Sequence, residues 1–367
     1  MKSILASYLK TAIDVITDND LDELERLLNE DELSGIERIT VYRTRDVQRA
    51  RTLLERLHLR CGEMKKLRSV NAHVNGDSKE LLDSVASIAR DCPAPKIFSL
   101  GLIHAPLTEK LIQACCAPSV KSVNIEFGAY TKEGMESLCE GLCNRQEPLH
   151  SLSFDNVEFD MDAMTIFSSA LPRLRLKGLL LGLQCGSVPY VQEEYQRLFK
   201  GLAECLEVNR ISLKITSDGH QRISFDEVLF SSILESIQCM ASLRELRWYG
   251  PVEFSTDQWL RLGKTVSKCP YLIELTVEKA GKQAEVDAFL DGCGPHPRLL
   301  RLNLGAPSLS IARTERWQTL RARCLTVLLV GNTVQRVGAH SSVYKIPRDI
   351  FRRLHSFLPE GERRVRN

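Results

Sequence analysis

One short motif recurs throughout this chain of 367 residues and constrains its fold more than any other feature. The motif is Leu-x-x-Leu-x-Leu, and Ile, Val, Phe, Ala or Trp also occupy its three anchor positions. A period of about thirty residues is typical of a solenoid, in which each repeat stacks on its neighbours. The eleven first anchors are Ile36, Leu67, Ile97, Val120, Leu149, Leu176, Val208, Leu243, Leu272, Leu299 and Leu325.

The spacing within and after each motif predicts one strand and one helix per repeat. The last two anchors are two residues apart, so they point to the same face of a short strand. Apolar residues at helical spacing follow most motifs, and Thr131 and Ser255 stand where helix N-caps are expected. Strand, helix and strand repeated in one direction require a parallel sheet with right-handed crossovers. We therefore predict an α/β solenoid with one sheet and one helical layer.

These motifs resemble the leucine-rich repeat family, and more narrowly its ribonuclease-inhibitor-like class, in which every repeat carries a helix. The resemblance covers about residues 36–331. It implies a horseshoe with a parallel concave sheet, convex helices and a protein partner on the concave face. The chain departs from the family at the ninth motif position, where Asn or Cys is expected and only Asn75 remains. We therefore expect an irregular horseshoe.

The repeats suggest three segments. Residues 1–35 are predicted to form an N-terminal helical cap, residues 36–331 a solenoid of about eleven units, and residues 332–367 a capping helix with a basic tail. That last helix begins at a proline and has one apolar stripe. It also resembles the opening of an F-box, which binds an adaptor of a ubiquitin ligase, although a cap explains the stripe more simply. The stripe consists of Ile350, Phe351, Leu354, Phe357 and Leu358, and an adaptor would be contacted through Pro347, Ile350, Phe351 and Leu354.

Charge and cysteine content argue for an intracellular protein that binds neither nucleic acid nor membrane. The formal net charge is +2, from 49 basic and 47 acidic residues. Twelve cysteines in a chain that shows no secretory signal indicate a reducing compartment. We expect a cytoplasmic location, or an intracellular one after secretion into a host cell. Most cysteines precede a first anchor by three to six residues, which predicts small buried thiols at the repeat junctions.

Motifs for catalysis are not found, so we predict no enzyme activity, no cofactor and no metal. His58, Cys61 and His73 form a weak metal-ligand candidate, because His58 fits a helix position better. Arg43 and Arg45 follow the first strand, where an arginine could act in trans as in leucine-rich-repeat GTPase activators. That interpretation is a remote alternative.

The outward strand positions change character along the chain, from small and polar to large and charged near residue 208. Arginine and aromatic side chains dominate interface hot spots, so we predict a protein-interaction scaffold centred on Arg247 and Tyr249. The alternatives are a ubiquitin-ligase substrate receptor or a secreted effector. A different interpretation is that the charges pair across strands and merely keep the face hydrated. The predicted partner-binding residues are Arg210, Lys214, Glu245, Arg247, Tyr249, Glu274, Glu278 and Arg301.

Overall fold

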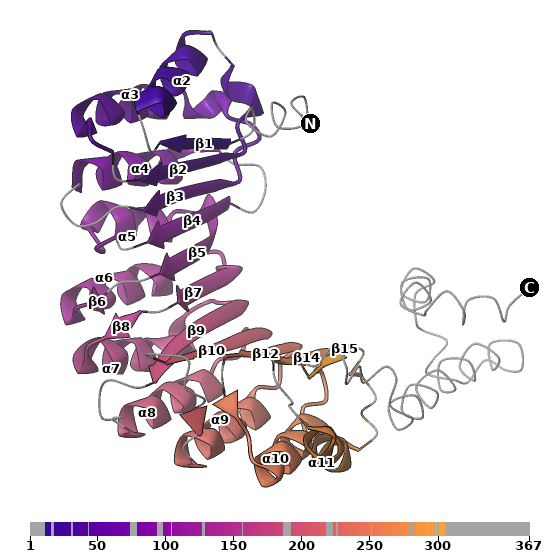
Figure 1. Cartoon of the computed structure of the whole chain (residues 1–367). Coiled ribbons are helices and arrows are strands. Elements are labelled where there is room, and N and C mark those ends of the chain that lie inside the picture. The colour runs from indigo at the N-terminus through magenta and orange to yellow at the C-terminus, as the bar shows by residue number, and fades with distance from the viewer. Residues whose placement is uncertain are drawn as a thin grey trace, which may run out of the picture. The chain divides into compact units, whose positions relative to one another are not determined.

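Eleven strands pair side by side in chain order, and every pair is parallel (Figure 1). The strands are β1 (Ala12–Val15), β2 (Arg38–Tyr42), β3 (Ser69–His73), β4 (Phe98–Ile103), β5 (Val120–Glu126), β7 (Ser151–Asp155), β9 (Gly178–Cys185), β10 (Arg210–Ser217), β12 (Glu245–Tyr249), β14 (Glu274–Val277) and β15 (Arg301–Asn303). Two short parallel pairs lie outside this sheet. They join β6 (Ala129–Tyr130) to β8 (Glu158–Phe159), and β11 (Ile223–Ser224) to β13 (Val252–Glu253).

This computed structural model describes residues 12–304 with short gaps. The gaps are at residues 16–17, 31, 43, 74–78, 94–97, 104, 127–128, 156, 186–191, 218–222, 225–226, 251, 279–281, 295, 297 and 300. Contacts divide the chain into two units, one of residues 1–294 with 298–308 and one of residues 295–297 with 309–367. The sheet and helices belong to the first unit.

The register of the sheet follows the motif. The second anchor of each repeat pairs with the second anchor of the next repeat: Ile39 with Val70, Val70 with Leu100, and so on to Leu275 with Leu302. The described anchors of the first ten motifs are buried, except for the partly exposed Leu302 at the last described strand. The predicted alternation of parallel strands and helices is therefore confirmed.

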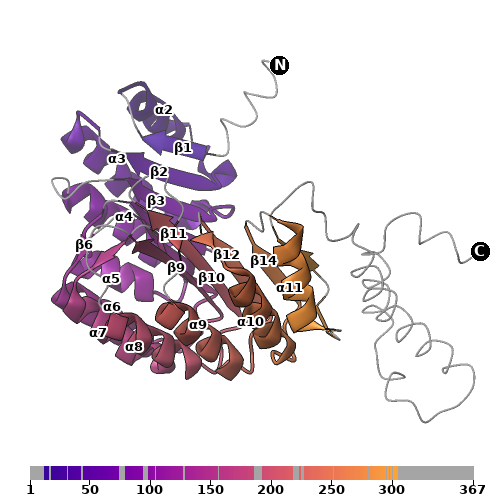
Figure 2. The ribbon, with the colours of Figure 1, turned by 60° about the horizontal axis from the view of Figure 1, so that its bottom comes forward.

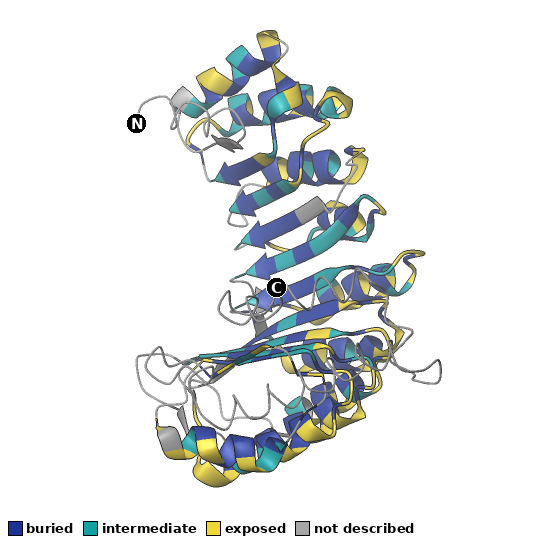
Figure 3. Ribbon diagram, turned by 90° about the vertical axis from the view of Figure 1, so that its right-hand side faces the viewer, coloured by how far each residue is buried: buried dark blue, intermediate teal, exposed yellow. Residues whose placement is uncertain are grey.

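The described helices cover one face of the sheet, and none of them lies on the other face (Figures 1 and 2). Their buried residues face the strands, while their exposed residues face outward (Figure 3). Ser255 forms a capping box with Gln258, as expected, but Thr131 makes no side-chain cap bond. The helices are α2 (Asp18–Asn29), α3 (Val47–Leu59), α4 (Lys79–Asp91), α5 (Glu109–Cys116), α6 (Lys132–Cys143), α7 (Met161–Ala170), α8 (Gln192–Ala203), α9 (Glu227–Cys239), α10 (Thr256–Ser267) and α11 (Gln283–Cys293).

Two glycines let α10 and α11 touch backbone to backbone. A Cβ atom on Gly263 would lie 2.2 Å from the carbonyl oxygen of Phe289, and one on Gly292 would lie 2.1 Å from that of Leu260. Both distances are far below a van der Waals contact, and backbone atoms cannot rotate away. Any larger residue at either position must therefore force the two helices apart.

The sheet begins one strand earlier than the sequence predicted. Residues 1–35 were expected to form a helical cap, yet β1 pairs with β2, with Ile13 opposite Ile39 and Val15 opposite Val41. Ile13 and Val15 thus hold the register of second and third anchors. Lys10 occupies the first-anchor position of that repeat, so the motif cannot be recognised there. Helix α2 follows β1, and its Leu21 and Leu24 are fully buried.

Candidate functional site

The open face, by which we mean the sheet face not covered by helices, carries three rows of outward side chains. One row precedes the second anchors, one lies between the second and third anchors, and one follows the third anchors. On β3, β5 and β7 the first two rows hold only Ser and Asn. On β10, β12, β14 and β15 the same rows hold mostly charged residues. The change of character predicted near residue 208 is therefore a change along one continuous surface.

Five of the predicted binding residues form a single chain of ion pairs across four strands, which we call the charged ladder. Glu245 Oε2 lies 3.6 Å from Arg210 Nε and 3.5 Å from Arg247 Nη2. Glu274 accepts hydrogen bonds of 3.0 Å from both Arg247 Nη2 and Arg301 Nη1. Three guanidinium groups thus share two carboxylates, which leaves a net charge of +1 on the ladder.

Arg247 is the central member because it separates two like charges. Glu245 stands directly opposite Glu274 in the register of β12 and β14, an arrangement that is unfavourable without a cation between the two. Burial acts to lower the pKa of the Arg247 guanidinium, but Glu274 and, more weakly, Tyr249 and Glu245 outweigh it and raise that pKa. Glu274 is also the most buried of the ladder's described ion-pair members, with 13 % of its side chain exposed. The ladder is thus held together from its middle.

Lys214, another of the predicted binding residues, forms an ion pair outside the charged ladder. Its Nζ donates to both carboxylate oxygens of Asp155, at 2.7 and 2.8 Å, although β9 lies between the two strands. Gly182 of β9 stands opposite Lys214 in the register. Because glycine has no side chain, the lysine can reach across that strand. The structure therefore connects the charged half of the open face with the small, polar half.

Tyr249 and Glu278 lie near the carboxyl ends of β12 and β14. Tyr249 is partly exposed and stands opposite Lys214. Glu278 follows β14, is exposed, and donates its backbone N–H to the carbonyl of Trp248 at 3.0 Å. The Glu278 carboxylate forms no ion pair with any described residue. Seven of the eight predicted residues therefore share contacts or register positions on one face, and Glu278 borders them.

The polar half of the open face carries short side chains. Ser69 Oγ donates to Asn71 Oδ1 at 3.2 Å, and Asn124 Nδ2 donates to Glu126 Oε1. Gly101 stands beside Asn71, where a Cβ atom would come within 2.4 Å of the amide oxygen. Short side chains that form hydrogen bonds within their own strands offer a partner few groups to contact. The charged half instead carries long arginine and glutamate side chains, of which Arg210 and Arg301 are exposed.

The prediction of buried thiols at the repeat junctions is confirmed for Cys92, Cys115, Cys205, Cys269 and Cys293, whereas Cys61, Cys116 and Cys143 are only partly buried. Within the described part of the chain, ten cysteines are present as free thiols, and Cys239 is exposed although burial was predicted for it. Cys205 Sγ donates to the carbonyl of Leu171 at 3.2 Å, and Cys269 Sγ to that of Thr265 at 3.3 Å. Burial raises the pKa of Cys205 to about 12 and that of Cys269 to about 11. These thiols are therefore protonated and structural at neutral pH.

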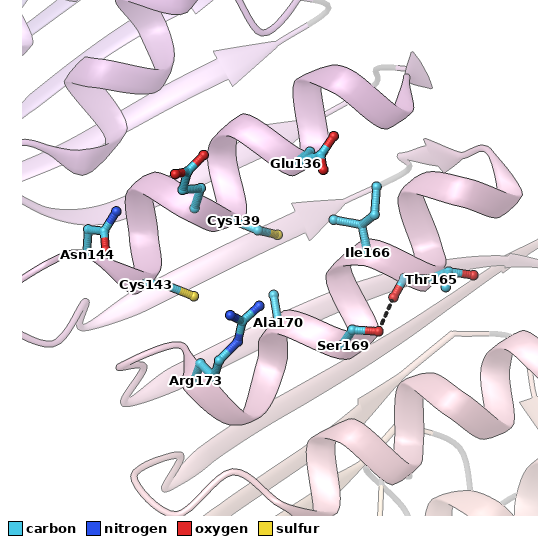
Figure 4. A pocket seen from close by; sticks show the side chains of 10 residues that line it. Glu136, Cys139, Cys143, Asn144, Thr165, Ile166, Ser169, Ala170 and Arg173 are labelled. Atoms are coloured by element: carbon cyan, nitrogen blue, oxygen red, sulfur yellow. Dashed lines mark hydrogen bonds between the residues drawn. The ribbon is translucent and has the colours of Figure 1, made fainter.

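A cavity of about 540 Å³ lies between α6 and α7 and was not foreseen from the sequence (Figure 4). Cys139 and Cys143 point toward it from α6, and Arg173 lies at its end beyond α7. Burial, and then Cys143, raise the pKa of Cys139 to about 12. Burial likewise raises the pKa of Cys143, against the opposing charge of Arg173. Neither thiol is thus prepared to act as a nucleophile.

The remaining candidates are separated or lie outside the described residues. His58 Nε2 bonds to Asp91 Oδ2 at 2.8 Å, while His73 stacks on Tyr42 with ring centroids 4.4 Å apart, so the weak metal candidate is not assembled. Among the described residues, no group of three His, Cys, Asp or Glu side chains has metal-binding geometry. Arg45 is exposed beside the cap of α3. Arg43, the motif beginning at Leu325, and Pro347, Ile350, Phe351 and Leu354 lie outside the described residues.

Comparison with family models and with curated proteins does not identify a family for this chain. No family model matches the chain, and no curated protein matches it significantly. Among the described residues, no helix has the length and apolar character needed to cross a bilayer.

Proposed function

We propose that the chain is a leucine-rich repeat protein of the ribonuclease-inhibitor-like class and acts as a non-enzymatic scaffold. Its partner is a protein that binds the open face over β10, β12, β14 and β15. The family assignment is supported by the in-register anchors, which put every described motif of the sheet in the same place relative to its neighbours. A solenoid of this kind presents one continuous surface on which outward side chains can change without disturbing the core.

The observation that carries the proposal is the charged ladder. Arg210 and Arg301 at its ends have 52 % and 59 % of their side chains exposed, so their guanidinium groups can still accept a partner. An arginine has five N–H donors, and among the described residues Arg210 forms an ion pair with Glu245 alone. Tyr249 adds a large, partly exposed aromatic side chain near Arg247. Arginine and tyrosine together at the centre of a rigid surface are typical of a binding hot spot.

An affinity comparison tests the proposal. Wild-type chain and the Arg247→Ala/Tyr249→Ala variant are used to capture partners from the cell of origin, and the affinity of each recovered partner is then measured with purified proteins. We expect the variant to bind at least about tenfold more weakly, the effect of losing one hot-spot residue. A variant that captures every wild-type partner with unchanged affinity would refute the proposed surface.

Two controls separate binding from folding. The Ser122→Ala/Ser151→Ala variant alters the polar half of the same face and should bind as the wild type does. Because Arg247 also separates Glu245 from Glu274, its replacement by Ala weakens local structure. The Arg247→Lys variant keeps the charge there, and circular dichroism checks that each variant retains the wild-type spectrum and melting temperature.

A further inference from the structure

A second surface runs along the amino-terminal ends of the strands, and we call it the basic edge. It consists of the residues that directly follow the first anchors of five successive repeats. Four of the five are basic or imidazole side chains, and the fifth is polar. In order along the sheet they are Lys121, His150, Lys177, Asn209 and Arg244.

Backbone hydrogen bonds show that these five positions are contiguous. The N–H of His150 donates to the carbonyl of Lys121 at 2.7 Å. The N–H of Asn209 donates to Lys177 at 2.9 Å, and the N–H of Arg244 donates to Asn209 at 2.8 Å. The bridge between Leu149 and Leu176 places Lys177 beside His150. The basic edge is therefore one line of residues at the strand spacing of about 4.8 Å.

The edge carries cations that the described carboxylates do not neutralise. Lys121 is paired with Glu147, and on neighbouring positions Arg175 lies 3.5 Å from Glu207 and Arg210 lies 3.6 Å from Glu245. These pairs leave two exposed cations, Lys177 and Arg244, whose side chains form no ion pair with any described residue.

The imidazole of His150 reports the same local charge. Burial lowers its pKa most, and Lys177, Lys121 and Arg210 lower it further, while Glu147 opposes them. Three cations from three repeats thus act on this one ring. Basic side chains thus gather at this edge, although the chain as a whole is nearly neutral.

We propose that the basic edge binds an acidic polypeptide segment of the protein partner, with Lys177 and Arg244 as its principal contacts. The edge borders the charged ladder through Arg210, so this inference rests on the proposed function and specifies the chemistry of the partner. A segment lying across the strands meets one edge position per strand. Its Asp and Glu side chains can bond to Lys177 and Arg244 without displacing an existing ion pair.

An acidic polypeptide fits this edge better than a nucleic acid does. Single-stranded nucleic acid binding relies on aromatic side chains on which bases stack, and none of the five edge residues is Phe, Tyr or Trp. The neighbouring carboxylates of Glu147, Glu207 and Glu245 would also repel a phosphate at every nucleotide. A polypeptide can place neutral residues opposite these glutamates.

Fluorescence anisotropy with a labelled alternating Glu/Ser peptide tests the inference on the full chain. We expect saturable binding that weakens as salt is raised, and about a tenfold loss of affinity in the Lys177→Glu/Arg244→Glu variant. The matched control is Lys200→Glu/Lys264→Glu, which makes the same charge change at exposed positions of α8 and α10. The control should bind the peptide as the wild type does.

Several outcomes overturn the inference. They are equal binding of a Lys/Ser peptide, an equal loss of affinity in the control variant, or binding of polyuridine RNA in place of the acidic peptide. If the charge-reversed variant loses its melting transition, Lys177→Gln/Arg244→Gln replaces it. The Arg247→Ala/Tyr249→Ala variant distinguishes the two proposals, because it should lose the partner but keep the acidic peptide. Peptide binding without any captured partner would retain the edge and reject the open-face function.

Discussion

The polar half and the charged half of the open face share the same kind of buried core, but their outward side chains differ. Under β5 and β7 lie Val123 and Leu152, and under β10 and β12 lie Ile211 and Leu246, all buried and all in one register. Above them, serine and asparagine give way to arginine and glutamate. The inward positions are constrained by packing, whereas the outward ones are not. The outward positions can therefore change along the sheet while the packing of the core stays the same.

The largest effect on the free energy of unfolding is expected from substitutions in the buried core, which is alike in the two halves. Leu152→Ala and Leu246→Ala should each lower the free energy of unfolding by about 2–5 kcal/mol, because each removes a fully buried anchor from a packed interior. Urea denaturation of both variants measures this effect. Equal costs would sharpen the comparison. A much smaller cost at Leu246 would show that the halves differ in their cores as well.

A smaller effect is expected within the charged half. Glu274→Gln should destabilise the chain by about 1–3 kcal/mol, because the carboxylate shared by Arg247 and Arg301 is largely buried and both guanidinium groups lose it. Glu126→Gln in the polar half is the counterpart, since Glu126 is only partly exposed and, among the described side chains, bonds to Asn124 alone. Thermal unfolding of the two variants under identical conditions gives the difference. Equal destabilisation would mean that the ladder has no structural role.

The smallest effect belongs to the contact that joins the halves. A double-mutant cycle with Lys214→Met and Asp155→Asn should give a coupling of about 0.5–1 kcal/mol, as expected for a partly exposed ion pair. The coupling should decrease at high salt because a partly exposed pair is screened. A coupling of zero would indicate that Lys214 crosses β9 without stabilising anything, and the two halves would then be independent.

Sequence reasoning could predict the core because its signal repeats. Each anchor is confirmed by its neighbours, so the single departure at Leu302 does not hide the pattern. The first strand was missed for the opposite reason, since Lys10 at the first-anchor position removes a third of the motif. The register then recovers that strand, because pairing depends on the backbone and not on the side chain at that position.

The candidate site was less predictable, because its contacts join residues that the repeat does not relate. The pairing of Lys214 with Asp155 depends on the missing side chain of Gly182 one strand away. The basic edge was overlooked although a signal existed, since Lys121, His150, Lys177 and Arg244 occupy the same motif position. The prediction considered only the outward positions within the strands, and the residue that follows each first anchor precedes most of those positions.

The constant register also fixes the distances between outward residues on different strands. Because each repeat advances the surface by one strand spacing, Arg210 and Arg301, three strands apart, stand about 14 Å from each other along the direction of stacking. Loss or gain of one whole repeat between them would change that separation by a single step and leave every other outward residue on its own face. A partner that contacts both Arg210 and Arg301 must therefore have contact points whose separation matches a whole number of strand spacings.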